Sequence, residues 1–153
     1  NKMTDKSYLL DTNYLIYLVD ETSSHEKRKA ILLDMAEKLQ AGDTEFFITP
    51  LILYEVLRGI PWQNHQKRKE IEQALLEFEI LDIQKEVAVL ATELYRFDYY
   101  YAQQNKQTKN LEKRKFDMFH YASAKINRLE ILSQDSDITK IEQLYQQMNQ
   151  SLK

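Results

Sequence analysis

Short apolar runs alternate along this chain with longer segments whose apolar residues recur at helical spacing. The short runs are rich in isoleucine, phenylalanine and tyrosine, which is typical of β-strands. The predicted strands cover residues 8–10, 45–48, 78–83 and 130–132. The predicted helices cover residues 25–41, 85–103 and 116–128, with a shorter one that opens at Pro50 after Thr49 and a last one from Ile138. This alternation predicts an α/β domain with a mainly parallel sheet and helices on both faces.

The length of 153 residues suits one ordinary domain of about 100–200 residues, and no Pro-, Gly- or Ser-rich linker divides the chain. We therefore expect a single domain over residues 1–153, in which residues 1–7 form a flexible start that holds a tag remnant. No apolar stretch approaches the ~20 residues of a membrane span, and the chain has no cysteine. These features predict a cytoplasmic protein without a membrane partner, a disulfide framework or a Cys-type zinc site.

Five acidic residues fall at or near the carboxyl ends of the predicted strands, where ligands of α/β sheets bind. Asp11 directly follows the first strand, and Asp135 and Asp137 follow the last one closely. Glu55 lies about one turn into the helix after the second strand. Asp117 lies in the first turn of its helix between apolar neighbours, where an unpaired acid is rare.

Carboxylates crowded at one sheet edge repel each other unless a cation neutralises them. Oxygen ligands without cysteine favour one or two Mg²⁺ or Mn²⁺ ions over zinc, and such ions support phosphodiester hydrolysis. Simpler interpretations stay open for each acid taken alone. Asp11 could cap a helix, Glu55 could lie on an exposed helix face, and Asp135 with Asp137 could form a polar turn.

Four segments in order resemble the motifs of PIN-domain nucleases. Residues 8–13 are a hydrophobic strand that ends in Asp-Thr-Asn, and residues 48–59 contain the glutamate of the second motif. Residues 116–124 place an aspartate at the start of a helix rich in small residues, and residues 132–137 place Ser and then Asp after the last strand. The resemblance extends from about residue 8 to residue 141.

The resemblance implies a three-layer α/β/α sandwich with a four- or five-stranded mainly parallel sheet. It also implies Mg²⁺- or Mn²⁺-dependent cleavage of RNA by a VapC-like toxin, which would form a homodimer and bind a small antitoxin. By position, the metal ligands would be Asp11, Glu55, Asp117 and Asp135, with Asp137 as an accessory carboxylate. The side chains that shape the pocket would be Thr12, Asn13 and Ser133.

The chain departs from the family pattern in three places. Ile138 stands where an aromatic residue is usual, Phe119 and His120 stand where aliphatic residues are usual, and residues 99–115 are longer and more polar. No further strand is predicted after residue 138, because that segment has helical spacing.

Other residues have two interpretations each. The basic triplet Lys113, Arg114 and Lys115 leads toward Asp117, and we expect it to contact RNA phosphates. His120 could assist proton transfer, although a structural histidine is the favoured interpretation.

Aromatic residues outside the motifs are equally ambiguous. Three consecutive tyrosines at residues 99–101 could stack on unpaired bases or form a core or dimer surface. Trp62 could anchor packing or contact an antitoxin.

Three other classes of protein share some of these sequence features. A haloacid-dehalogenase-type phosphohydrolase needs a second aspartate where Asn13 stands. A receiver domain could use Asp82 but lacks the adjacent pair of acids at the first strand. A catalytically silent PIN-like module that binds RNA or protein is disfavoured because all four acidic positions are retained.

The net charge taken alone opposes an RNA partner, since 21 basic residues stand against 24 acidic ones for a net charge of −3. Four or five of those acids are assigned to a site that metal would neutralise. The remaining surface would then be near neutral or basic, so the net charge does not exclude RNA.

Overall fold

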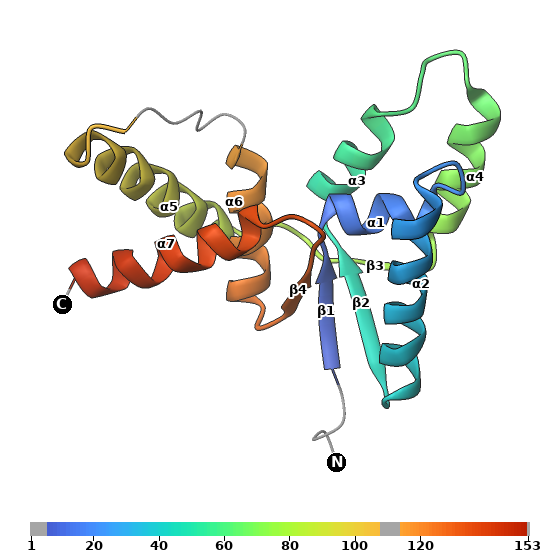
Figure 1. Ribbon diagram of the computed structural model, residues 1–153, viewed down its shortest axis with the longest axis horizontal. Helices are drawn as coiled ribbons and strands as arrows, with labels where there is room; N and C mark the ends of the chain where they lie inside the picture. The colour runs from blue at the N-terminus through green and yellow to red at the C-terminus, as the bar shows by residue number, and fades with distance from the viewer. Residues whose placement is uncertain (1–5, 108–113, 153) are drawn as a thin grey trace. The chain divides into compact units, whose positions relative to one another are not determined.

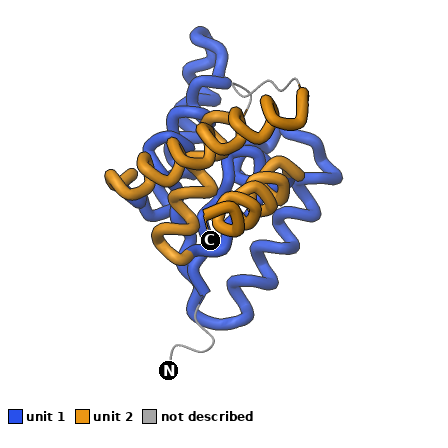
Figure 2. The backbone as a smooth tube through the Cα atoms, turned by 90° about the vertical axis from the view of Figure 1, so that its left-hand side faces the viewer, with its two compact units in different colours: residues 1–82, 129–134 blue, residues 83–128, 135–153 orange. Residues whose placement is uncertain are grey.

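The computed structural model of the protein describes residues 6–107 and 114–152. The chain divides into two compact units (Figures 1 and 2). Unit 1 comprises Asn1–Asp82 with Leu129–Gln134, and unit 2 comprises Ile83–Arg128 with Asp135–Lys153.

Unit 1 contains a parallel sheet of four strands in the order β3-β2-β1-β4. The strands are β1 (Lys6–Leu10), β2 (Thr44–Ile48), β3 (Glu79–Ile80) and β4 (Glu130–Leu132). The two central strands end in apolar residues that are fully buried, as expected when both faces of a parallel sheet are covered. The predicted α/β class with a four-stranded parallel sheet is confirmed.

The third strand is shorter than predicted. Residues 78–83 alternate like a half-buried strand, but only Glu79 and Ile80 pair with β2, and both are exposed. One further hydrogen bond, from the Leu81 amide to the Ile48 carbonyl at 2.8 Å, continues this edge before the chain leaves the sheet. An edge strand has a neighbour on one side only, so alternation over six residues did not guarantee six paired residues.

Four helices lie in the part of unit 1 that the structure describes. They are α1 (Thr12–Val19), α2 (His25–Gln40), α3 (Pro50–Arg58) and α4 (His65–Leu75). The predicted start of α3 is confirmed, because the Ile52 amide donates to the Thr49 hydroxyl at 3.2 Å and Pro50 occupies the first helical position. Asn64 caps α4 in the same way through the amide of Lys67 at 3.1 Å.

A polar contact holds α1 to α2 within the core of unit 1. The hydroxyl of Tyr14, which is almost fully buried, donates to Asp34 at 2.7 Å, and Lys38 pairs with the other oxygen of Asp34 at 2.6 Å. Burial, and then the hydrogen bond and charge of Asp34, raise the pKa of Tyr14, so its hydroxyl stays protonated as a donor. This contact positions the helix that follows Asp11.

Among its described residues, 83–107, 114–128 and 135–152, unit 2 has the helices α5 (Lys85–Gln104), α6 (Lys115–Ile126) and α7 (Asp137–Ser151). Its core consists of apolar residues from all three helices, among them Val87, Leu94, Met118, Ala122, Ile141 and Leu144. The segment after residue 138 is helical, as predicted, and the ends of the other long helices agree with the sequence within two residues.

Two partly buried polar contacts connect the helices of unit 2. Arg114, just before α6, donates to the fully buried Asp98 of α5 at 3.1 Å. The Tyr121 hydroxyl of α6 donates to Glu142 of α7 at 2.8 Å. None of the helices within the described ranges is long and apolar enough to cross a membrane.

Candidate active site

Asp11 lies at the carboxyl end of β1 and is 2% exposed. Its amide donates to the Leu132 carbonyl at 2.9 Å, which continues the pairing of β1 with β4. Its carboxylate accepts from the Thr12 amide at 2.9 Å and so caps α1. The capping interpretation of this residue is therefore confirmed, whereas its role as a metal ligand stays a prediction.

Ser133 and Asn13 connect the end of β4 to the start of α1. The Ser133 hydroxyl lies 2.8 Å from Asp11 Oδ2 and 3.3 Å from Asn13 Oδ1. The amide of Gln134 donates to Asn13 Oδ1 at 2.9 Å. The contacts fix the orientation of the Asp11 carboxylate and hold the segment that immediately precedes Asp135 in the chain. Unit 1 thus brings together Asp11, Asn13 and Ser133.

Glu55 of α3 faces the start of α1. The Thr12 hydroxyl donates to Glu55 Oε1 at 2.9 Å, and Arg58 Nη2 lies 3.8 Å from Glu55 Oε2. The glutamate side chain is 12% exposed, whereas that of Arg58 is half exposed. Glu55 is therefore not on an exposed helix face, and Thr12 links it to the residue next to Asp11.

The acids of unit 2 form a second set at the start of α6 and α7. One carboxylate oxygen from each of Asp117, Asp135 and Asp137 lies within 4.8 Å of the other two. Asp117 and Asp137 are half-buried, and Asp135 is exposed. The Asp137 amide donates to Asp135 Oδ1 at 3.0 Å, which is the geometry of a polar turn, and Lys140 lies 3.8 Å from Asp137.

The donor set of both groups suits a hard divalent cation. The ligand atoms on offer are carboxylate oxygens supported by hydroxyl and amide groups, and the chain contains no cysteine. Three carboxylates within 4.8 Å repel one another, and a bound cation removes that repulsion. Mg²⁺ and Mn²⁺ prefer such oxygen ligands, so the residues present fit the predicted metal.

The residues predicted to contact RNA have different surroundings. His120 is 1% exposed within α6, and one of its ring nitrogens lies within 4.8 Å of a carboxylate oxygen of Asp117, so both of its interpretations stay open. Arg114 is paired with Asp98, and Lys115 is exposed, with its amine 5.4 Å from the centroid of the Phe116 ring. Lys113 lies outside the described residues. An RNA contact by these residues stays a prediction.

Sequence reasoning missed Arg58 as a neighbour of the glutamate. The signal was present, because residues three apart on a helix lie on the same face. It also missed the partner of Arg114. Asp98 lies 16 residues earlier, in α5, and only the packing of α5 against the start of α6 brings the two side chains together.

We expect Ser133→Ala to lower the affinity for Mn²⁺ by about 10–100-fold, since residues that orient a ligand have effects of that size. The substitution removes the hydroxyl that holds Asp11 Oδ2. Isothermal titration calorimetry measures the change. Ser133→Thr keeps a hydroxyl and should retain most of the affinity. Ser23→Ala, which removes a hydroxyl bonded to the Asp20 carbonyl, serves as control. Equal Mn²⁺ binding by wild type and Ser133→Ala would contradict this role.

The order of the sheet and the acids at its strand ends define an α/β protein with the fold that the motifs resemble. The PIN domain family model matches residues 8–144. The chain belongs to the PIN domain family.

Solved structures with the same fold include complexes from several bacteria. The VapBC2 complex of Rickettsia felis, bound to a DNA fragment from its promoter, aligns with a TM-score of 0.61 at 16% identity and covers 88% of this chain and 91% of that chain. A toxin–antitoxin complex from Klebsiella pneumoniae has a TM-score of 0.52 at 23% identity, with 84% and 87% covered. FitAcB from Neisseria gonorrhoeae has a TM-score of 0.60 at 17% identity, with 88% and 91% covered. Comparison with curated protein sequences finds no significant match.

Proposed function

We propose that this protein is a metal-dependent endoribonuclease that hydrolyses RNA phosphodiester bonds with Mg²⁺ or Mn²⁺. The observation that carries the proposal is the group formed by Asp117, Asp135 and Asp137, whose oxygens lie within 4.8 Å of one another. Membership of the PIN domain family supports the same conclusion.

The proposed roles follow the two sets of residues. Asp11 and Glu55 from unit 1, and Asp117 and Asp135 from unit 2, hold one or two ions, with Asp137 as an accessory carboxylate. When bound, such ions supply an activated water and neutralise charge on the leaving oxygen. We assign both sets of acids to one metal centre because they match the motifs of the family.

The side chains that support these ligands have defined tasks. Ser133 orients Asp11 through its hydroxyl, and Thr12 holds one oxygen of Glu55. Asn13 holds the backbone just before Asp135. Fixed carboxylates bind a small cation better than mobile ones because less side-chain entropy is lost on binding.

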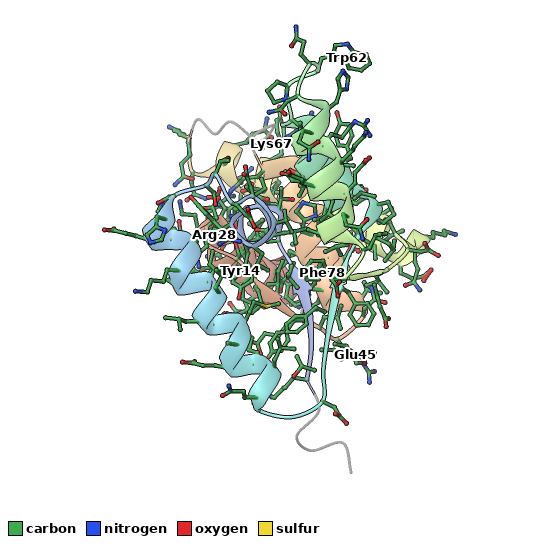
Figure 3. The ribbon with its side chains drawn as sticks, turned by 90° about the vertical axis from the view of Figure 1, so that its right-hand side faces the viewer. Tyr14, Arg28, Glu45, Trp62, Lys67 and Phe78 are labelled. Carbon is green, nitrogen blue, oxygen red and sulfur yellow. The ribbon has the colours of Figure 1, made fainter. Side chains whose placement is uncertain are left out.

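The toxin role is a second part of the proposal. The structural neighbours are toxin–antitoxin complexes, and we propose that this chain likewise pairs with a small antitoxin and forms a homodimer in the cytoplasm. Trp62 lies between α3 and α4 and is 88% exposed (Figure 3). A side chain so exposed does not anchor the core, which supports an antitoxin contact.

We expect RNA cleavage by the purified protein to require Mg²⁺ or Mn²⁺ and to stop when EDTA is added. The reason is that the carboxylates cannot activate water at neutral pH without a cation. Gel analysis of a labelled RNA checks this, and excess Mn²⁺ after EDTA should restore cleavage. Cleavage that continues unchanged in EDTA would contradict the proposal.

A catalytically silent PIN-like module is the second candidate. The capping role of Asp11 favours it, because a cap alone explains that aspartate without any metal. RNA binding without cleavage in Mg²⁺ and in Mn²⁺ would identify this alternative.

A further inference from the structure

The outward side of α5 exposes a row of side chains along most of the helix. Val87 and Leu94 of α5 pack in the core of unit 2, on the other side of the helix. Six exposed residues of α5 are spaced alternately by three and four, and this spacing places them in one line along a helix. We call them the α5 row: Glu86, Val89, Glu93, Arg96, Tyr100 and Gln103.

The α5 row has the same spacing when it is read from either end. If two copies of the chain pair α5 antiparallel about a two-fold axis at the middle of the row, Glu93 of each copy lies opposite Arg96 of the other. The same axis places Val89 opposite Tyr100, and it places the acid at one end of the row opposite the amide at the other end. The row is therefore complementary to itself in charge and in apolar surface.

The charges of α5 favour a second copy of this chain over a polyanion. Among the exposed residues of α5, the acids Glu86 and Glu93 are offset by the cations Lys85 and Arg96. The remaining charged residue of the helix, Asp98, is fully buried. A face without net charge attracts RNA little, whereas its separate charges suit a partner that carries the same charges in reverse order.

Charge also decides the direction in which two α5 helices pair. Neither Glu93 nor Arg96 forms an ion pair with another residue in the part of the chain that the structure describes. An antiparallel copy gives each of them an opposite charge. A parallel copy would place Glu93 beside Glu93 and Arg96 beside Arg96, and such like charges repel. The antiparallel arrangement is therefore the favoured one.

A groove beside the α5 row can accept an aromatic ring of the second copy. It has a volume of about 670 Å³. Its lining includes Val89 and Glu93 of α5, Ile126 of α6 and Tyr145 of α7. In the antiparallel arrangement Tyr100 of the second copy lies opposite Val89, so its ring covers the apolar part of this groove.

Tyr100 is well placed for such a contact. Its ring packs at a tilt against Phe97, with centroids 6.3 Å apart, while 55% of the residue stays exposed. Val89, on which the ring of the second copy would pack, is 49% exposed. A ring that is already held loses little entropy on binding, and burial of both side chains removes apolar surface from water.

We propose that the α5 row is the surface through which two copies of this protein associate, with their α5 helices antiparallel. Two symmetric ion pairs join Glu93 of each copy to Arg96 of the other, and Tyr100 of each copy packs on Val89 of the other. The inference rests on the homodimer proposed above and assigns its contact surface. The apolar contacts supply affinity, and the ion pairs fix register and direction.

Charge reversal tests the register of the proposed contact. Glu93→Arg places cations opposite each other in both ion pairs, and Arg96→Glu places acids opposite each other. Each variant should raise the Kd of the dimer about tenfold or more, as measured by analytical ultracentrifugation over a series of concentrations. An equimolar mixture of the two variants should restore the wild-type Kd, because every cation then faces an acid in the mixed dimer.

Disulfide cross-linking tests the direction of the helices. The chain has no cysteine, so introduced cysteines report contacts without background. A mixture of Glu86→Cys with Gln103→Cys should form a cross-linked pair on mild oxidation, because these positions lie opposite each other in the antiparallel arrangement. Each variant alone should stay uncross-linked, since its two cysteines lie at opposite ends of the paired helices.

A matched control alters another exposed apolar residue. Leu33 of α2 is 58% exposed, and Leu33→Glu should leave the Kd of the dimer unchanged. Circular dichroism and thermal melting confirm that each variant is folded.

The results that would overturn the inference are distinct from failure of the proposed function. A wild type that is monomeric at every concentration would overturn both the proposed homodimer and its surface. A wild-type dimer that persists in both charge variants, is not restored by their mixture, or is lost in Leu33→Glu would overturn the surface alone. Cross-linking of a single cysteine variant with itself would overturn the antiparallel arrangement. RNA cleavage by the wild type in Mn²⁺ reports the nuclease function separately.

Discussion

Asp117→Asn is expected to lower the rate of RNA cleavage by more than about a hundredfold, which exceeds the effect of residues that only orient a ligand. Asparagine keeps the shape of aspartate but removes the negative charge, so it binds Mg²⁺ or Mn²⁺ poorly. Asp117 is half-buried and shares its surroundings with Asp135 and Asp137. Removing one of three repelling charges should leave the helix folded. Initial rates in Mn²⁺, with circular dichroism as the check of folding, measure this.

Asp11→Asn should have the same effect on cleavage, because both acids are proposed metal ligands. Asp82→Asn is the matched control, since Asp82 is exposed and lies outside both acidic sets. Equal cleavage by the wild type and both variants would show that the activity came from a contaminant and would overturn the assignment. Loss of cleavage together with loss of the helical spectrum would show a structural role instead.

Arg114→Met should destabilise the protein by about 3–5 kcal/mol, the size expected when one partner of a buried ion pair is removed. The substitution leaves the carboxylate of Asp98 buried without its 3.1 Å partner. Urea denaturation followed by circular dichroism measures the change in the free energy of unfolding.

The control for this variant removes an arginine from an exposed pair. Arg68→Met breaks a 2.8 Å contact with Glu72, in which both side chains are nearly half exposed, and should change stability by less than about 1 kcal/mol. Adding Asp98→Asn to Arg114→Met should recover part of the loss, because the buried charge is then absent. Similar effects for Arg114→Met and Arg68→Met would contradict a structural role for the buried pair.

The local elements were predictable because their signals are local. Thr49 and Pro50 mark the start of α3 through a cap and a restricted backbone angle, and both act within four residues. The predicted strands that end at Leu10 and Leu132 are the strands β1 and β4, because buried parallel strands need continuous apolar residues. The length of β3 was not predictable in this way, since it depends on how many residues of β2 pair with it.

Contacts between residues far apart in the sequence could not be predicted from sequence patterns. The basic triplet that includes Arg114 predicts an RNA contact, whereas the structure pairs Arg114 with Asp98. The repeated charge is visible in the sequence, but its counter-charge comes from another helix. Likewise, no pattern showed which hydroxyl would orient Asp11.

The sequence by itself determined the α/β class, the family and the acidic residues at the strand ends, because periodicity and motif order are properties of neighbouring residues. Only the tertiary structure decided that Ser133 orients Asp11 and that Thr12 holds Glu55. These pairs lie 122 and 43 residues apart along the chain. Hydrogen bonds need atoms within about 3 Å, and for such residues that proximity exists only after the strands have paired.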